Sequence, residues 1–222
     1  MSVQTALVTG GNRGIGQAIA EMFRKQGMNV LTPARAEMDL LSNSSIDNYL
    51  AGLDGRVDIL VNNAGINPLG TAAGFTDTDL EATLQVNLIA PLRLIRALAP
   101  AMAERRFGRI VNISSIWSAV SKPRRTVYSA AKSGMNGMTR AVAVELAKDN
   151  VLINAVAPGF VSTDLTRQNN SPEELERIAA AIPCGRLAEP AEIAALVLFL
   201  CSERNSYITG QTLFIDGGYT CL

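Results

Sequence analysis

The sequence predicts an α/β fold: a doubly wound, Rossmann-type parallel sheet with helices on both faces. Short apolar runs rich in β-branched residues alternate along the chain with longer segments whose apolar residues recur at helical spacing. Hydrophobic residues make up 48% of the chain and aromatic residues 5%, a balance typical of aliphatic helices packed on a buried parallel sheet. Strands that alternate with helices in this way are joined as parallel neighbours by crossover helices.

Six segments have the composition of buried strands. They are ALVTG (6–10), NVLTPA (29–34), VDILVNNAG (57–65), RIVNIS (109–114), VLINAVAP (151–158) and TLFIDGG (212–218). Helical periodicity between them predicts helices over 17–27, 80–106, 129–150 and 190–203. A short helix is also predicted over 171–183, because Ser171 suits an N-cap and Pro172 a first turn. Its position before the last strand is that of a lid.

Length and composition predict one domain, residues 1–222, because the chain shows no internal repeat and no linker-like segment. Lysine plus arginine number 20 and aspartate plus glutamate 20, so the formal charge is zero and no field favours nucleic acid or an anionic membrane. We see no signal peptide and no apolar run near the ~18 residues of a membrane span. The three scattered cysteines and the absence of histidine argue against disulfides and metal, so a cytoplasmic protein is expected.

The stretch TGGNRGIG (9–16) joins the first predicted strand to the first helix. Its glycines would let the backbone approach a pyrophosphate at the helix N-terminus, although they also suit a tight structural turn. The second strand ends at Arg35 without the carboxylate that binds a ribose 2′-hydroxyl in NAD-preferring folds. Arg35 and Arg13 would instead hold a 2′-phosphate, which predicts NADP(H) over NAD(H), unless both are solvated surface charges.

Since the chain has no histidine, its proton chemistry must come from other groups. In YSAAK, Tyr128 and Lys132 lie four residues apart and thus on one face of a predicted helix. A free tyrosine has a pKa of about 10. We expect the Lys132 ammonium and the positive nicotinamide of an oxidised cofactor to lower the pKa of Tyr128 toward neutrality.

Seven motifs occur in a fixed order along the chain. They are TGGNRGIG, NNAG (62–65), Asn87, the serine pair 114–115, YSAAK, PGFVST (158–163) and ITGQTLFIDGG (208–218). With them the chain resembles the short-chain dehydrogenase/reductase family over nearly its whole length. The resemblance implies about seven parallel strands, a nicotinamide cofactor and hydride exchange between a carbonyl and an alcohol. It also implies a homotetramer or homodimer built on two long helices, here about residues 81–105 and 128–148.

The resemblance also implies roles for single residues. Tyr128 would be the general acid, Lys132 its partner, Ser115 rather than Ser114 the catalytic serine, and Asn87 the residue that holds a water against the lysine backbone. The implied cofactor contacts are Gly10, Asn12, Arg13, Gly14, Ile15, Gly16, Arg35, Asp39, Leu40, Asn63, Ala64, Gly65, Tyr128, Lys132, Pro158, Gly159, Val161 and Thr163.

The chain departs from the family after its second strand. From Arg35 it passes through AEMDL into LSNSSIDNYLAGL (41–53), so the family's next helix is missing and its third strand is reduced to a stub. This departure puts the wall of the adenine pocket in doubt.

The substrate is predicted less specifically. Trp117 is either an apolar wall over the substrate or a core residue. Lys122, Arg124, Arg125 and Arg167 form either a basic rim for an anionic substrate or, as we favour, a solvated face or subunit contact. The main prediction is an NADPH-dependent reductase of a ketone, of the 3-oxoacyl thioester or keto-sugar type. The alternatives are an NAD-dependent alcohol dehydrogenase working oxidatively and a non-catalytic NADP-binding regulator.

Overall fold

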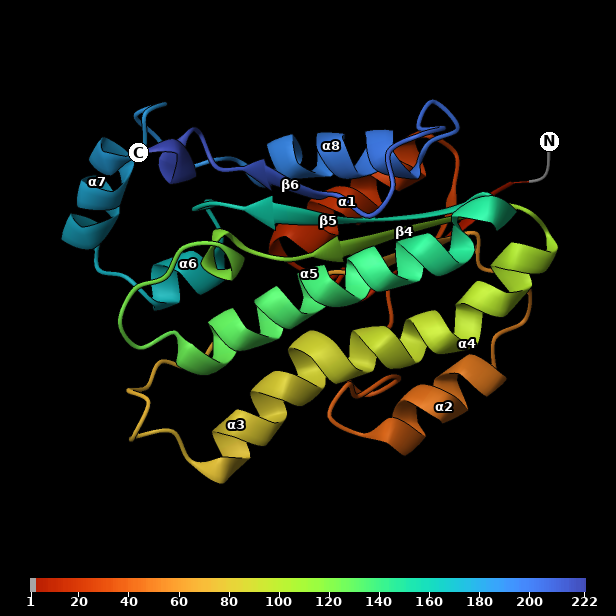
Figure 1. The fold of residues 1–222 in the computed structure, drawn as a ribbon, viewed down its shortest axis with the longest axis horizontal. Coiled ribbons are helices and arrows are strands. Elements are labelled where there is room, and N and C mark those ends of the chain that lie inside the picture. Colours follow the sequence, from red (N-terminus) through yellow and green to blue (C-terminus); the bar gives the residue numbers. More distant parts are fainter. Residues whose placement is uncertain (1–2) are drawn as a thin grey trace.

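The computed structural model describes residues 3–222, with the backbone alone described at residue 165. Helices cover both faces of one parallel sheet (Figure 1). The strands are β1 (Thr5–Val8), β2 (Asn29–Leu31), β3 (Ile59–Asn62), β4 (Gly108–Ile113), β5 (Val151–Pro158) and β6 (Thr212–Ile215). They lie in the order β2-β1-β3-β4-β5-β6, so the doubly wound α/β prediction and all six predicted strands are confirmed.

The strand order reverses between β1 and β3, and this is where an open α/β sheet binds its ligand. The family resemblance implied about seven strands, and that number is wrong for the described chain, which has six. Residues 35–42 form turns where the missing strand would lie, so β2 becomes the edge of the sheet. The short connection explains this, because it leaves too few residues for a crossover.

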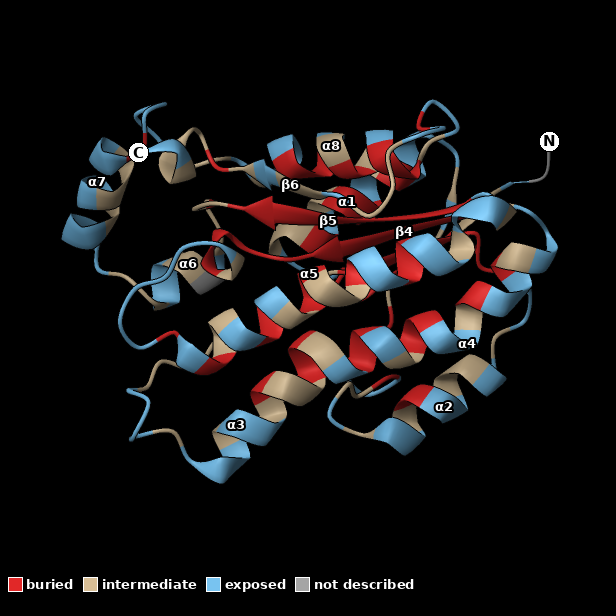
Figure 2. Cartoon of the chain, viewed as in Figure 1, coloured by how far each residue is buried: buried red, intermediate tan, exposed pale blue. Residues whose placement is uncertain are grey.

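Two hydrophobic layers hold the sheet between its helices. Along β3, Val61 packs into one layer with α1 (Gly14–Lys25) and α8 (Pro190–Cys201), while Leu60 packs into the other. Alternate strand residues point to opposite faces, so both faces are apolar and the central strands are buried (Figure 2). The second layer contains α2 (Asn43–Ala51), α4 (Ala90–Glu104) and α5 (Thr126–Leu146).

The remaining elements border the carboxyl ends of the strands or join the helices. They are α3 (Asp77–Leu84), the π-helix η1 (Gln85–Ile89), the short helices η2 (Ile116–Ser118), η3 (Ala147–Asp149) and η4 (Tyr219–Cys221), and the helices α6 (Asp164–Gln168) and α7 (Pro172–Ala181). Helix α7 begins where the sequence predicts. The Ser171 hydroxyl accepts from the Glu174 N–H, and the Glu174 carboxylate accepts from the Ser171 N–H.

The continuous helical run from α3 to α4 corrects one sequence expectation. It spans 28 residues, Asp77–Glu104, and is long and apolar enough to cross a membrane by length and composition alone. However, 44% of its most apolar window is buried inside the protein, and Leu94 and Met102 pack fully into the second layer. The apolar residues of this helix therefore form part of the core.

Helix α2 was not predicted from the sequence. The Ser42 hydroxyl caps it by accepting from the Ser45 N–H, and Ile46 is its buried anchor. A hydrogen-bonded ion pair joins α2 to α4: the Arg93 Nε donates to the Asp47 carboxylate at 2.8 Å. This helix follows β2 closely and covers the flank of the sheet that the shortened connection leaves.

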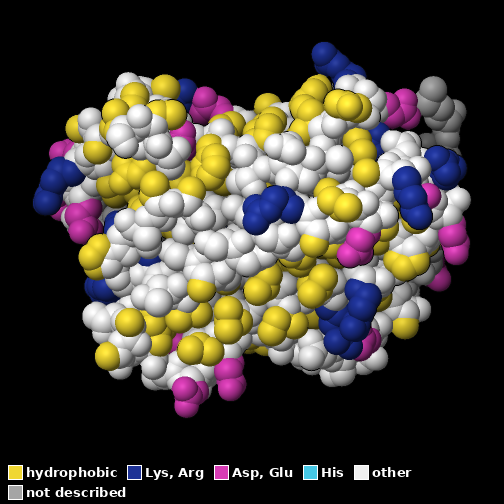
Figure 3. All heavy atoms as spheres, viewed as in Figure 1, with side chains coloured by type: hydrophobic (Ala, Val, Ile, Leu, Met, Phe, Trp, Pro, Cys, Tyr) yellow, Lys and Arg dark blue, Asp and Glu magenta, His cyan; other side chains and the backbone are white. Residues whose placement is uncertain are grey.

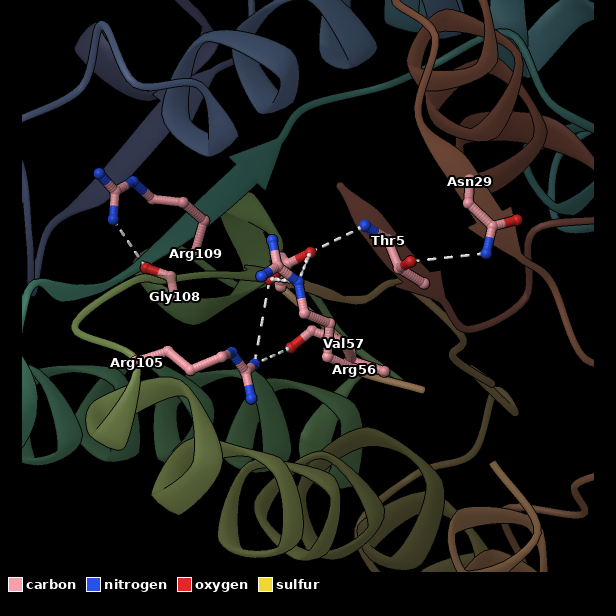
Figure 4. Close-up of polar contacts among 8 residues, drawn as sticks. Thr5, Asn29, Arg56, Val57, Arg105, Gly108 and Arg109 are labelled. Atoms are coloured by element: carbon pink, nitrogen blue, oxygen red, sulfur yellow. Dashed lines mark hydrogen bonds and ion pairs between the residues drawn. The ribbon is translucent and has the colours of Figure 1, made fainter. Parts of the chain in front are cut away.

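A buried carboxylate fixes the amino ends of the strands, opposite the ligand-binding edge (Figure 4). Asp58 is 1% exposed, accepts from the Thr5 N–H at 3.0 Å and pairs with Arg56 at 3.0 Å. Arg105 lies 4.0 Å from the same carboxylate and donates to the Val57 carbonyl. Because its charge is paired and hydrogen-bonded, Asp58 ties β1 to β3 and to the end of α4.

Candidate active site

A cavity of about 310 Å³ opens at the carboxyl ends of the strands, at the reversal of the strand order. It brings together most of the residues that the sequence analysis selected. These are Gly10, Arg13, Gly14, Ile15, Asn63, Ala64, Gly65, Ser115, Tyr128, Lys132, Pro158, Gly159, Val161 and Thr163. The other selected residues, Asn12, Gly16, Arg35, Asp39, Leu40 and Asn87, do not belong to its lining.

The glycine loop is shaped for close contact. Gly10 and Gly14 have φ of 63° and 55°, in the left-handed region that favours glycine. A Cβ at Gly16 would overlap the Gly10 carbonyl oxygen, so the loop folds tightly against the start of α1. Asn63 holds the loop by donating from Nδ2 to the Thr9 and Gly10 carbonyl oxygens, at 2.9 and 3.1 Å. The backbone N–H groups at the start of α1 are thereby set for an anion.

Thr9 is a supporting residue that the sequence analysis missed. Its hydroxyl accepts from the N–H groups of Asn63 and Ala64, both at 3.0 Å, and so joins the end of β1 to the end of β3. The signal in the sequence was a hydroxyl residue at the end of the first apolar run, directly before the glycines.

Lys132 lies at the floor of the cavity and is 2% exposed. Its Nζ donates to the Ile113 carbonyl oxygen at 2.7 Å and lies 5.5 Å from the centroid of the Tyr128 ring. Burial lowers the pKa of Lys132 to about 7. An ammonium has three donors and this contact uses one, so the others can serve ribose hydroxyls at the cavity floor.

Asn87 reaches the same floor from a π-helical turn. Its Nδ2 donates to the carbonyl oxygens of Thr83 and Ile66, both at 2.9 Å. Its buried Oδ1 has no hydrogen-bond partner within the described residues. A Cβ at Gly65 would lie 2.8 Å from this Oδ1 and 3.8 Å from Lys132 Nζ, so the three residues converge. Such a polar site suits a bound water.

Tyr128 and Ser115 line the same cavity, and the Ser115 Oγ accepts from the Trp117 N–H at 3.2 Å. The Ser114 hydroxyl instead donates to the Asn136 Oδ1 at 2.7 Å, so it is engaged by a buried side chain of the protein interior. Burial raises the pKa of Tyr128 more than the Ser115 hydroxyl and the Arg125 charge lower it. The prediction that the pKa of Tyr128 is lowered is therefore wrong for the protein without its cofactor, because the desolvation of the phenolate outweighs the nearby cations.

The two arginines predicted for the adenine side lie in different surroundings. Arg13 lies on the cavity wall, whereas the Arg35 side chain is 75% exposed and its Nε lies 3.3 Å from the Asp39 carboxylate. Asp39 also accepts from the Leu41 N–H at 3.0 Å and so organises the turn into α2. No carboxylate ends β2, as the sequence indicates.

The segment after β5 closes the other side of the cavity. A Cβ at Gly159 would lie 2.8 Å from the Asp216 Cα, so only glycine allows this close approach. Val161 is buried and pairs with Ala188 in an isolated bridge. Thr163 caps α6 and stands over the glycine loop, since a Cβ at Gly14 would lie 3.4 Å from its methyl group.

An aromatic row forms the wall beyond Tyr128. Trp117 packs edge-to-face on Phe160 at 5.8 Å, and Phe160 on Tyr219 at 5.4 Å between centroids. Trp117 is buried and also part of the cavity lining, so its position is compatible with either of the two predicted roles. Arg125 is likewise buried and lines the cavity, which corrects the expectation of a solvated face for this residue.

The tight glycine loop, the free donors of Lys132 and the unpartnered Asn87 oxygen fit a dinucleotide at this edge of the sheet. A doubly wound sheet with such a cavity and a tyrosine–lysine pair defines a dinucleotide-dependent oxidoreductase.

Comparison with known proteins agrees with this class. A family model described as enoyl-(acyl carrier protein) reductase matches residues 36–220. The chain is 36% identical to the 3-oxoacyl-acyl-carrier-protein reductase FabG of Vibrio cholerae serotype O1, over 97% of this chain and 96% of that protein. It is 40% identical to nodulation protein G of Rhizobium sp. strain N33, over 96% and 95% of the two chains. The solved structure of a 4-hydroxyisoleucine dehydrogenase mutant complexed with NADH and succinate superposes with a TM-score of 0.94 at 28% identity, covering 99% of each chain.

The chain belongs to the short-chain dehydrogenase/reductase family. It is an NAD(P)-dependent oxidoreductase acting on CH–OH and C=O groups.

Replacing Lys132 tests whether the burial of its charge destabilises the folded protein. The pKa of Lys132 is about 7 in the folded protein and about 10.4 in an unfolded chain, so between these values only the unfolded chain holds the proton and stability rises with pH. Below about pH 7 both states are protonated and the full cost of the buried charge remains. We expect Lys132→Met to stabilise the cofactor-free protein by about 1–3 kcal/mol at neutral pH, and by less as the pH rises toward 10.

Urea unfolding at about pH 6.5 and about pH 9.5 measures this difference. Lys148→Met, at an exposed lysine, serves as the control and should show no such trend. The account is contradicted if Lys132→Met does not raise the free energy of unfolding, or if it raises it equally at both pH values.

Proposed function

We propose that the protein uses NADPH to reduce a ketone to a secondary alcohol. The observation that carries the proposal is that Ser115, Tyr128 and Lys132 line one cavity at the strand ends, with the Lys132 Nζ 5.5 Å from the centroid of the Tyr128 ring. The resemblance to a 3-oxoacyl-acyl-carrier-protein reductase supports the direction. In this proposal residues 1–222 act as one domain.

The nicotinamide cofactor, when bound, supplies the hydride to the carbonyl carbon. Tyr128 gives its phenolic proton to the carbonyl oxygen, and its raised pKa keeps that proton in place at neutral pH until negative charge develops there. Ser115 donates a hydrogen bond to the same oxygen. Lys132 binds the ribose hydroxyls, and Asn87 orders a water beside it through its free Oδ1. Hydride and proton together convert the ketone to the alcohol.

The preference for NADP(H) is supported by the charges around the adenine side. The end of β2 carries no carboxylate, and the next acids along the chain are already engaged: Glu37 accepts from the Ala34 N–H and Asp39 pairs with Arg35. Arg13 on the cavity wall and the exposed Arg35 offer guanidinium groups for a 2′-phosphate. In this proposal Gly10, Asn12, Gly14, Ile15 and Gly16 hold the pyrophosphate.

The proposed substrates are 3-oxoacyl thioesters or keto-sugars. The row of Trp117, Phe160 and Tyr219 offers an apolar wall beside the reacting group. Asn67, Asn169 and Asn170 line the same cavity and offer hydrogen bonds to hydroxyl or amide groups.

A second function, NAD-dependent oxidation of an alcohol, is favoured by one comparison. The similar 4-hydroxyisoleucine dehydrogenase is a dehydrogenase that was solved with NADH. A non-catalytic regulator finds less support, because the proton-transfer residues are intact and share one cavity.

We also propose a soluble, cytoplasmic homotetramer. Apolar side chains lie on the face over α3, α4 and α5 (Figure 3), and a groove between α4 and α5 is lined by Ile89, Leu92 and Val142. Val144 on α5 is 85% exposed. A partner copy would cover these residues. All three cysteines are free in the described chain, as a reducing compartment requires.

Removing the phenolic hydroxyl tests the role of Tyr128. We expect Tyr128→Phe to lower kcat at least about 1000-fold, because the variant lacks the hydroxyl that gives its proton to the carbonyl oxygen in this proposal. Fluorescence titration should show NADPH binding within about 3-fold of wild type. Substantial turnover in this variant refutes the assignment.

Cofactor kinetics test the arginines. Wild type should favour NADPH over NADH at least about 10-fold in kcat/KM, and Arg35→Ala should reduce that preference without changing the KM for NADH. Arg204→Ala, at an exposed arginine outside the cavity lining, is the matched control. A wild-type preference for NADH rejects the proposed cofactor and favours the oxidative function.

Sedimentation velocity tests the assembly. At micromolar concentration we expect a tetramer, and Leu92→Glu should dissociate it, because the new carboxylate would be buried against a partner copy. A wild-type monomer rejects the proposal.

A further inference from the structure

The segment before α5 has an unusual backbone conformation, directly before a buried arginine. Arg124 has a φ of 70°, in the left-handed region that a non-glycine residue seldom adopts. Arg124 itself is exposed, and the chain then begins α5 with Arg125 at the N-cap. Such local strain persists where the surroundings favour it and is concentrated at functional sites.

The Arg125 guanidinium is 4% exposed, yet it lines the cavity. Its Nε and Nη1 atoms are buried and have no hydrogen-bond partner among residues 3–222. The group lies 5.9 Å from the Trp117 ring centroid. Burial lowers the pKa of Arg125, which reflects the cost of desolvating an unpaired cation. A buried charge is normally paired, so this one calls for an anion that the chain itself does not provide.

A second cation stands on the same aromatic wall. The Lys122 amine lies 5.7 Å from the Trp117 ring centroid and 6.0 Å from that of Phe160. The acidic neighbour of Lys122 is Glu174 on α7, whose carboxylate is engaged by the Ser171 N–H at 2.8 Å. Asp164, which also lines the cavity, lies 3.9 Å from Arg167.

We propose that Arg125, assisted by Lys122, binds an oxyanion of the substrate, so that the preferred ketone carries a carboxylate or a phosphate ester. The inference rests on the proposed function and specifies its substrate class. Arg125 comes three residues before Tyr128 in sequence, and both line one cavity, so the anion would lie close to the reacting carbonyl. The planar guanidinium suits both oxyanions, and its position fixes which carbonyl meets the Tyr128 hydroxyl.

Matched substrates test this inference, since each pair keeps the ketone and changes the charge. The pairs are acetoacetate against its methyl ester, 4-oxopentanoate against its methyl ester, and dihydroxyacetone phosphate against dihydroxyacetone. We expect wild type to favour the anionic member in kcat/KM for at least one pair, and Arg125→Gln to reduce that ratio about 10- to 100-fold. The pair with the largest loss identifies the oxyanion. Arg125→Lys should retain part of the ratio, and Arg124→Gln, at the exposed neighbour, should retain all of it.

A binding measurement separates this inference from the proposed function. Calorimetric titration of acetoacetate and of dihydroxyacetone phosphate into protein with NADP⁺ reports anion binding without turnover, and Arg125→Gln should weaken it at least about 10-fold. The inference is overturned, and the proposed function stands, in either of two cases. In the first, wild type reduces ketones but has the higher kcat/KM for the neutral member of every pair. In the second, Arg125→Gln lowers kcat/KM equally for both members of each pair. If wild type reduces no ketone yet binds the anion through Arg125, the proposed function fails and the anion site stands. Circular dichroism checks the fold of each variant, and Arg125→Lys gives the test if Arg125→Gln does not fold.

Discussion

The buried ammonium of Lys132 is the constraint on which the rest of the site depends. A charge that is 2% exposed is costly, and among residues 3–222 its one hydrogen-bond acceptor is the Ile113 carbonyl at the end of β4. That contact joins α5 to the end of β4, and Tyr128 lies one turn earlier on the same helix. The π-helical turn at Asn87 and the glycine at position 65 serve the same end, because they bring a free oxygen beside the ammonium and leave no side chain in its way.

The same burial gives the site its chemical character without a histidine. Desolvation raises the pKa of Tyr128 and lowers the pKa of Lys132, so the phenol holds its proton at a pH where the lysine amine begins to lose its own. A phenol that keeps its proton at neutral pH is suited to donate it, and the cations around it stabilise the phenolate that results. Arg125 and Lys122 extend this cationic environment along the aromatic wall, where a substrate anion would complete the balance of charge.

The sheet and much of the cavity could be predicted from the sequence, because buried strands and glycine turns are encoded locally. Apolar runs such as residues 151–158 have no other stable environment, and the left-handed φ of Gly10 and Gly14 explains their residue type. Helix α2 was missed because Ile46 is its one fully buried residue, and Tyr49 and Leu50 are only partly buried. The effects of desolvation on charged and titratable side chains were harder to predict from the sequence. Whether Arg125 faces solvent, and whether burial or charge controls Tyr128, depends on packing between segments far apart in the chain.

The most direct test of this account is the titration of Lys132 itself. The chain has four lysines, so a ¹³C-lysine label gives few ε-carbon resonances, and loss of one in Lys132→Met assigns the signal. The account predicts that Lys132 titrates near pH 7 in the free protein, about 3 units below an ordinary lysine, and at a higher pH with the dinucleotide bound, because ribose oxygens would then accept its free donors. A Lys132 that titrates near pH 10 in both forms would contradict it.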